Sequence, residues 1–272
     1  MRPLPRSDFR EIPGWVIDLQ LRHPDQQIVI QLDEIDRLLA YDASRNESFF
    51  RMLRSLAQEK RCQFIFSGER TILDKMADPS SSFFNFVTPV YLGLLDSETT
   101  VRIVTDPMRL VGVTLEAESL ATTIYEYTSG HPNLIQYVCR ECLRRLSRQR
   151  TRLLTRAVVI GVLESSPFRE QYLATYWSQA TPIEKAISVC AAEKKTVTLP
   201  DIKSRLAAAG CVASIGELKR CVNYLILCQL LEADSDSYRI RPARFVDALA
   251  PFPLSAWLED FLAERSTEKA AN

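Results

Sequence analysis

Apolar and polar residues follow one another along the first hundred positions in a pattern that predicts a strand, a helix and a second strand. The run Ile28–Leu32 is almost wholly apolar, as a strand buried in a sheet requires. Within Glu47–Lys60, apolar residues recur at helical spacing. Cys62–Phe66 then forms a second short run rich in apolar residues. This order predicts two parallel strands joined by a crossover helix.

Polar side chains follow each of these two strands. Asp33 and Glu34 come directly after the first strand, with Asp36 close behind, and Ser67 and Arg70 follow the second. Because the carboxyl ends of parallel strands meet at one edge of a sheet, we expect these residues to share that edge. The first carboxylate could hold Mg²⁺ through its water shell, and the second could orient or deprotonate a water molecule. The alternative is an ordinary buried strand followed by an acidic helix N-terminus, which suits the helix dipole.

Three further segments extend the pattern. A third strand is expected over Val87–Leu92, although Pro89 weakens it because proline cannot donate to a strand ladder. Amphipathic helices are expected over Thr114–Thr128 and Pro132–Arg148. Gly130 suits the end of the first of these helices, and a proline suits the first position of the next.

These motifs together resemble those of the P-loop NTPases of the AAA+ and STAND groups, over roughly residues 10–250. Leu32-Asp33-Glu34 resembles their Walker B element, and Phe66-Ser67-Gly68-Glu69-Arg70 resembles the end of their sensor 1 strand. Gly130-His131-Pro132 resembles the Gly-x-Pro turn of STAND lids, although a plain corner between two helices would use the same residues.

The resemblance implies a role for each of these residues. Asp33 would support Mg²⁺ and Glu34 would activate water, while Ser67 or Arg70 would sense the γ-phosphate of ATP. His131 and Pro132 would belong to the nucleotide site, with Pro132 packed near adenine. The implied cofactor is ATP or ADP with Mg²⁺, and no structural metal is expected.

The phosphate-binding loop of these families is missing from the sequence. None of the eight glycines is followed by lysine, so no Gly-x-x-x-x-Gly-Lys-Ser/Thr motif occurs. Without that loop the sheet of the resembling families also lacks a central strand. Three alternatives follow: the chain is a fragment with a late start, it completes its sheet with a partner, or it is a degenerate regulator with a rearranged core. We favour the first two together. The chain by itself is not expected to be an autonomous ATPase.

The carboxyl-terminal part shows the pattern of a winged helix, which the resemblance also implies. Three helices are expected over Pro182–Ala192, Leu199–Ala209 and Ser214–Cys228, and two short strands over Leu230–Ala233 and Tyr238–Arg241. Each helix start carries a plausible cap: Thr181, Asp201 and Ser214. DNA binding through this module is an alternative function, because its third helix and its hairpin carry some basic residues. The His-Asp pair of some STAND families is absent, which puts closure of this module over ADP in doubt.

Composition changes this picture little. Lysine plus arginine equals aspartate plus glutamate, at 34 each, so no overall charge attracts nucleic acid or a membrane. Seven scattered cysteines suit a reducing cytoplasm. The pair Cys139 and Cys142 has the spacing of half a zinc site, but no second pair accompanies it, so core thiols are favoured. No signal peptide and no membrane span is expected.

Two surface features complete the reading. Arg140–Arg156 holds seven arginines and one acid. Arginines suit a helix C-terminus and cover apolar surface, and the alternative is a surface that contacts phosphates of a nucleotide or nucleic acid. Pro251–Ala263 is an apolar helix that packs on the winged helix or docks another domain, and packing is favoured.

The predicted fold is a partial parallel α/β sheet of a P-loop NTPase core, followed by an α-helical lid and a winged-helix (α+β) domain. The domains are expected at 1–108 (core), 109–178 (lid), 179–250 (winged helix) and 251–272 (terminal helix and tail). The predicted function is a STAND/AAA+-like regulatory or signalling module, a nucleotide-dependent switch if the phosphate loop is supplied upstream or in trans. The alternative is a winged-helix DNA-binding or transcription-regulating protein of initiator-type AAA+ ancestry. A protein partner or self-association through the incomplete sheet is expected, and no membrane.

Overall fold

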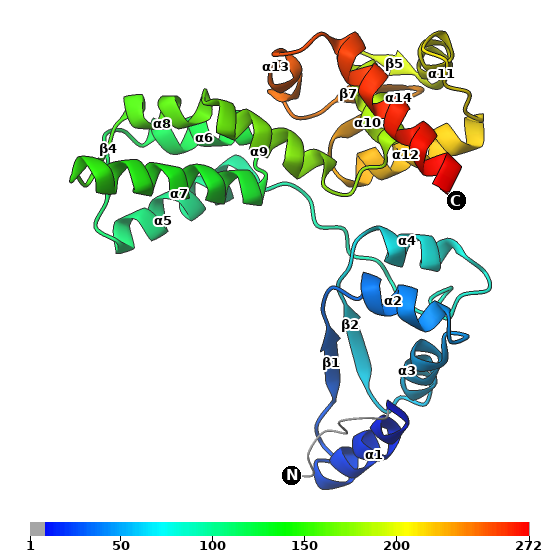
Figure 1. The fold of residues 1–272 in the computed structure, drawn as a ribbon. Coiled ribbons are helices and arrows are strands. Elements are labelled where there is room, and N and C mark those ends of the chain that lie inside the picture. The colour runs from blue at the N-terminus through cyan, green and yellow to red at the C-terminus, as the bar shows by residue number, and fades with distance from the viewer. Residues whose placement is uncertain (1–8, 272) are drawn as a thin grey trace. The chain divides into compact units, whose positions relative to one another are not determined.

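The computed structural model describes residues 9–271, so the first eight residues of the predicted core domain and Asn272 lie outside the described residues. The chain forms two compact units, which divide between Val90 and Tyr91 (Figure 1). Each unit is described by itself. No helix in the described part of the chain combines the length and the apolar character needed to cross a membrane.

The described part of the first unit contains two parallel strands, a short 3-10 turn and four helices. In chain order these are the turn η1 (Phe9–Glu11), α1 (Ile12–Arg22), β1 (Val29–Leu32), α2 (Asp36–Ala43), α3 (Ser48–Gln58), β2 (Gln63–Phe66) and α4 (Arg70–Ala77). The strands pair in parallel, with Leu32 opposite Phe66. The predicted strand–helix–strand unit is therefore confirmed, with α2 and α3 in the connection between the strands.

The two faces of this small sheet differ. Apolar side chains on one face pack against the helices, and a cluster of phenylalanines from α3, β2 and the segment after α4 fills the space beside it. The other face carries Val29 and Ile65, which are 50% and 52% exposed. This face also carries Gln31 and Gln63, so it mixes apolar and polar side chains, and it has no cover within the described part of this unit.

The third predicted strand, Val87–Leu92, is wrong. The structure gives residues 87–96 no regular secondary structure, and Val90, Tyr91 and Leu92 are exposed. Pro89 cannot donate a ladder hydrogen bond, and this segment connects the two units instead of joining a sheet.

The second unit begins with a bundle of helices. Its elements are α5 (Ser97–Leu110), β3 (Thr114–Leu115), α6 (Ser119–Thr128), α7 (Pro132–Gln149), β4 (Leu153–Leu154), α8 (Arg156–Leu163) and α9 (Ser166–Trp177). The helix predicted over Thr114–Thr128 starts too early. Thr114 and Leu115 pair in parallel with β4, because the Thr114 amide donates to the Arg152 carbonyl at 2.8 Å and fixes an extended backbone there.

The rest of this unit holds three helices, a three-stranded sheet and two terminal helices. They are α10 (Pro182–Ala192), β5 (Val197–Thr198), α11 (Leu199–Ala208), α12 (Ile215–Leu227), β6 (Leu231–Asp234), β7 (Ser237–Ile240), α13 (Phe245–Leu249) and α14 (Leu254–Ala271). The predicted helices and hairpin strands are confirmed, and β5 was not predicted. The sheet order is β5-β7-β6, antiparallel throughout.

Local caps explain why these helices begin where they do. The Thr198 amide donates to the Asp201 carboxylate at 2.9 Å, and the Glu217 amide donates to the Ser214 hydroxyl at 3.1 Å. Both Asp201 and Ser214 are caps that the sequence predicts.

The terminal helix α14 packs on this unit, as favoured. Leu258 and Phe261 are buried in its core, and Arg265 is buried with its guanidinium on the Glu217 carboxylate at 2.6 Å and on the Cys211 sulfur.

The cysteines of the apparent helix Pro132–Gln149 lie against the core. Cys142 is fully buried and Cys139 is partly buried. Burial raises the pKa of the Cys139 thiol to about 11 and that of Cys142 to about 12. Both side chains are protonated at neutral pH and pack as small apolar groups.

Candidate functional site

The carboxyl edge of β1 and β2 gathers the polar residues that the sequence predicts there. Beyond the last strand pair, the Ser67 amide donates to the Leu32 carbonyl at 3.0 Å, and the Ile35 amide donates to the Ser67 carbonyl at 3.1 Å. These two bonds continue the ladder past the strands. They place the residues that follow β1 directly beside those that follow β2.

Asp33, Glu34 and Ser67 form one hydrogen-bonded cluster at this edge. The Ser67 hydroxyl donates to the Asp33 carboxylate. The Glu34 amide is shared between Asp33 Oδ1 at 3.0 Å and Ser67 Oγ at 3.2 Å. Both carboxylates are exposed. The expected meeting of these three residues is therefore confirmed, while their chemical roles remain predictions.

Glu34 adopts a backbone conformation that few residues other than glycine adopt. Its φ is +51°, in the left-handed region. The bonds from its amide to Asp33 and Ser67 hold it there. Strain of this kind gathers at functional sites, where the surrounding structure determines the conformation.

Asp36 has a role at this edge that sequence reasoning missed. Its carboxylate accepts the Glu69 amide at 2.8 Å and the Thr71 amide at 2.9 Å, so it caps the first turn of α4 from α2. Gly68 permits this approach, because a Cβ there would lie 2.6 Å from Asp36 Oδ2. The third acid of the run was the available signal, but its partners lie 33 and 35 residues away.

Arg70 opens α4, three residues after Ser67, in the turn that Asp36 anchors. Ser67 and Arg70 are therefore carried by a turn whose position depends on α2. The two residues that the sequence predicts as sensors are thus carried by a turn that the Asp36 carboxylate fixes in place.

The residues present fit one part of a magnesium–nucleotide site. Mg²⁺ in such sites is held by one or two carboxylates together with substrate phosphates, and Asp33 and Glu34 can supply the acid side. Among the described residues, no group of three or more His, Cys, Asp or Glu side chains is arranged to hold a metal by itself. The printed sequence also contains no Gly-Lys-Ser/Thr loop to cradle the phosphates. The carboxylates that a hydrated Mg²⁺ needs are present, whereas the printed sequence does not contain the loop that would bind the phosphates.

His131 and Pro132 lie in the second unit, apart in sequence from the acidic edge. Pro132 is the first residue of α7, as predicted, and His131 is its N-cap. The His131 ring packs edge-on against Tyr176, with ring centroids 5.3 Å apart, and burial lowers the pKa of its imidazole. His131 is thus neutral and part of the packing of this unit.

The turn before His131 is held from two sides. The Leu95 amide donates to the Gly130 carbonyl at 2.9 Å, and the Ala243 amide donates to the Ser129 hydroxyl at 3.2 Å. Residues just after the hairpin therefore touch this turn directly. The contact is made by a backbone amide and a serine hydroxyl.

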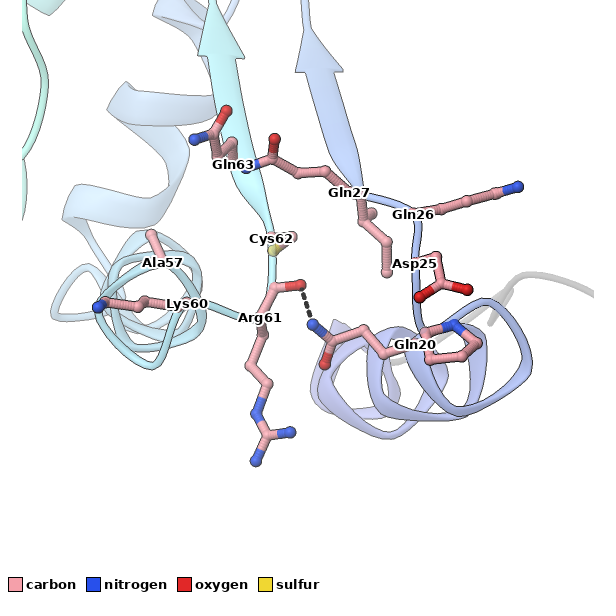
Figure 2. Close-up of a pocket in the computed structure, with 11 residues that line it drawn as sticks. Gln20, Asp25, Gln26, Gln27, Ala57, Lys60, Arg61, Cys62 and Gln63 are labelled. Carbon is pink, nitrogen blue, oxygen red and sulfur yellow. Dashed lines mark hydrogen bonds between the residues drawn. The ribbon is translucent and has the colours of Figure 1, made fainter.

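A pocket of about 600 Å³ opens at the other end of the sheet, at the amino ends of β1 and β2. Figure 2 shows its lining, in which the Gln20 side-chain amide donates to the Arg61 carbonyl at 2.7 Å. The lining mixes glutamine amides with Asp25, Lys60 and Arg61. It belongs to the opposite ends of the strands from Asp33, so it is not part of the acidic edge.

Comparison with known proteins supports a P-loop NTPase-like fold. A family model described as an AAA-like domain matches residues 15–231. Comparison with curated proteins gives no match.

Among solved structures, the chain is similar to a Walker-type ATPase of Pyrococcus abyssi, with 17% identity, a TM-score of 0.57, and coverage of 91% of this chain and 68% of that one. It also matches the ORC2 protein of Aeropyrum pernix in its ADPNP–ADP complexes, with 12% identity, a TM-score of 0.49, and coverage of 97% and 73%. A mutant of Thermotoga maritima RuvB matches with 16% identity, a TM-score of 0.44, and coverage of 88% and 76%. At these identities the likeness to the first structure concerns the fold alone.

Proposed function

The chain belongs to the family of AAA-like domains, and from this premise we propose that it is an ATPase-derived regulatory module that switches with bound nucleotide. The observation that carries the proposal is the cluster of Asp33, Glu34 and Ser67 at the carboxyl edge of the parallel strands. An α/β sheet binds its ligands at this edge. Two adjacent exposed carboxylates and a hydroxyl suit a hydrated metal and an attacking water.

Each residue then has one task in the switch. Asp33 supports Mg²⁺, Glu34 orients or deprotonates water, and Ser67 or Arg70 senses the γ-phosphate. His131 and Pro132 contribute to nucleotide binding. Asp36 positions the turn that carries the sensor residues, because it caps that turn through two backbone amides.

The phosphate loop has to be supplied, either by sequence before the acidic strand in the full protein or by another chain. Among the described residues β1 and β2 pair only with each other, so each strand leaves one ladder edge unpaired, which supports completion of the sheet by further strands. The switch therefore depends on a strand and a loop that join this sheet edge to edge.

The second unit supplies the moving parts in this proposal. The helices α5–α9 act as the lid, and α10–α12 with the sheet β5-β7-β6 act as a winged-helix module. The order of three helices and an antiparallel three-stranded sheet supports the latter assignment. A hydrogen bond from the Ala243 amide to the Ser129 hydroxyl links the module to the predicted nucleotide turn, so a movement of that turn acts directly on the residues after the hairpin.

A first experiment tests the dependence on a supplied phosphate loop. We expect the chain alone to show no ATP hydrolysis above background and no ATP affinity tighter than millimolar, because nothing in its sequence cradles the phosphates. Isothermal titration calorimetry with Mg²⁺–ATP measures this. Micromolar binding by the chain alone would overturn this account of the core.

A second experiment tests the acidic edge in a protein that has the loop, from its own upstream sequence or from a partner. Glu34→Gln should keep nucleotide binding and slow hydrolysis by ~10²–10⁴-fold, the usual contribution of a positioned base. Asp33→Ala should weaken Mg²⁺-dependent binding, and Ser67→Ala or Arg70→Ala should slow turnover with smaller effects on binding.

Glu69→Gln is the matched control for the second experiment. Glu69 is a carboxylate of the same edge that contributes its backbone amide, to Asp36. The Glu69→Gln substitution removes the same charge as Glu34→Gln and should leave turnover nearly unchanged. Equal and small effects of all these substitutions would mean that the carboxylates only cap structure, and the proposal would fail.

A further inference from the structure

The arginines of 140–156 do not act as one surface, because the structure divides them by partner. Arg140 and Arg144 lie on the Glu141 carboxylate, at 3.7 and 2.8 Å. The Arg145 guanidinium donates to the Gly161 carbonyl at 2.9 Å and thereby joins α7 to α8. These three side chains have structural partners.

A second group of arginines gathers where two helices end. Arg148 lies in the last turn of α7, Arg150 is its C-cap, and Arg152 follows two residues later. The Arg152 carbonyl accepts the Thr114 amide at 2.8 Å, and its guanidinium lies 2.5 Å from where a Cβ on Gly112 would stand.

The end of α5 meets the end of α7 at this point, and Arg109 is contributed by α5. Figure 1 shows these helix ends and β4 at the same end of the helical bundle. We call Arg109, Arg148, Arg150 and Arg152 the arginine corner.

The arginine corner holds charge that the fold does not neutralise. All four side chains are exposed. Within the described part of the chain, no carboxylate lies within ion-pair distance of Arg148, Arg150 or Arg152, while Arg109 is 3.8 Å from Asp106. A C-terminal helix dipole favours cations, but its effect ends within the last turn. Arg152 lies beyond the C-cap of α7, so the dipole does not account for it.

The hairpin of the carboxyl-terminal module is different, although it is where a winged helix would be searched for nucleic-acid contacts. Arg239 pairs with Glu232 across the strands. Arg244 pairs with Asp247 at 2.8 Å and stacks on the Tyr127 ring. Two of the arginines there therefore already form ion pairs with acidic side chains.

We infer that the arginine corner binds the phosphate backbone of a double-stranded nucleic acid. The guanidinium group is planar and presents paired donors that match phosphate oxygens, and it stays charged at every physiological pH. Phosphate contacts position a protein on a duplex without reading bases, so binding is independent of sequence and sensitive to salt.

An anionic lipid surface offers the same phosphate chemistry and has to be distinguished. Leu110, beside Arg109, is 88% exposed and could enter a bilayer interface. Membrane-interface segments, however, anchor themselves through tryptophan and tyrosine. Neither residue type, nor phenylalanine, occurs in the corner's sequence at 109–115 or 148–154. The duplex is therefore the favoured partner.

The test compares two variants that lose the same charge. Arg148→Gln/Arg152→Gln removes two corner arginines, and Arg140→Gln/Arg144→Gln removes two that Glu141 already pairs. Binding of the full chain to a fluorescein-labelled DNA duplex of arbitrary sequence is followed by anisotropy over a series of salt concentrations. The corner variant should bind at least about tenfold more weakly, and the slope of log affinity against log salt should fall by about 2.

The control variant loses the same amount of charge, so it measures the general electrostatic effect alone. It should lose no more than about threefold in affinity. Circular dichroism melting shows that both variants fold, and Arg109→Gln alone gives a second, smaller loss from the other helix end. Equal losses in the two double variants overturn the inference. The inference is also overturned if the chain does not bind the duplex but binds phosphatidylserine vesicles, and if Leu110→Ser weakens that vesicle binding.

Discussion

Single residues at the acidic edge are held in states that the folded protein has to maintain. Glu34, at φ +51°, takes a conformation that costs a residue with a side chain roughly 1–2 kcal/mol. Hydrogen bonds from its amide to Asp33 and Ser67 offset that cost. A glycine would adopt this conformation more easily, so the backbone geometry itself does not favour a glutamate at this position.

Glu47 is a second residue whose charge state matters. Burial alone would raise its pKa, but hydrogen bonds from the Lys75 ammonium at 2.6 Å and the Ser82 amide at 2.6 Å outweigh burial and lower the pKa to about 2. The ionised form therefore stabilises the first unit. That contribution is complete above the ordinary carboxyl pKa and is lost as the pH falls through the lowered one.

We expect Glu47→Gln to lower the stability of the first unit by roughly 1–2 kcal/mol near pH 7, with the difference shrinking below about pH 4.5. The free energy of amide exchange in α3 and β2 measures it at each pH. Glu59→Gln is the control, because that side chain is 55% exposed and its loss should cost little. A difference between Glu47→Gln and the parent that does not change with pH would contradict the assignment.

At the scale of elements, the turn between α6 and α7 depends on one glycine. Gly130 has φ +76°, and a Cβ there would overlap the Leu95 carbonyl oxygen and lie 3.0 Å from its carbon. Backbone atoms cannot move aside as a flexible side chain can. This close approach fixes the segment before α5 against the turn that carries His131.

Gly130→Ala should therefore destabilise the second unit by about 3 kcal/mol or more, from backbone strain and overlap together. Gly210→Ala is a matched control, since Gly210 has φ +81° but nothing within 4 Å of the added Cβ. It should cost only about 1 kcal/mol of strain. Thermal melting of the two variants compares them, and equal losses would show that the contact with Leu95 has no energetic weight.

At the scale of the whole molecule, the unpaired edges and the uncovered face of the two-stranded sheet lead us to expect assembly. Exposed apolar strand surface invites pairing with another chain. We expect the chain to self-associate at high micromolar concentration or to copurify with a protein that offers a strand. Light scattering after gel filtration measures the mass in solution.

Val29→Lys/Ile65→Lys should abolish this association without unfolding the unit, because both side chains are about half exposed. Leu21→Lys is the control, since Leu21 is an exposed apolar residue of α1 away from the sheet face. If the parent chain is a monomer and the two lysine substitutions do not change its mass in solution, the sheet is complete as it stands.

The sequence by itself determined the elements and the edge at which the chemistry gathers. Apolar spacing is a local property, so the runs before Asp33 and Ser67 predicted the parallel strands, and Asp201 and Ser214 marked helix starts. The order strand, helix, strand was enough to bring Asp33, Glu34 and Ser67 to one edge, because parallel strands must end on the same side.

Only the tertiary structure decided which groups are partners. Asp36 caps a turn more than thirty residues away, and Glu47 meets Ser82 across a similar separation. The run of arginines reads as one block along the chain, yet Glu141 neutralises part of it while the corner remains free. The two-residue strand at Thr114 exists only because the Arg152 carbonyl lies opposite it. Pairings of this kind depend on distances set by packing, which a pattern of neighbouring residues does not contain.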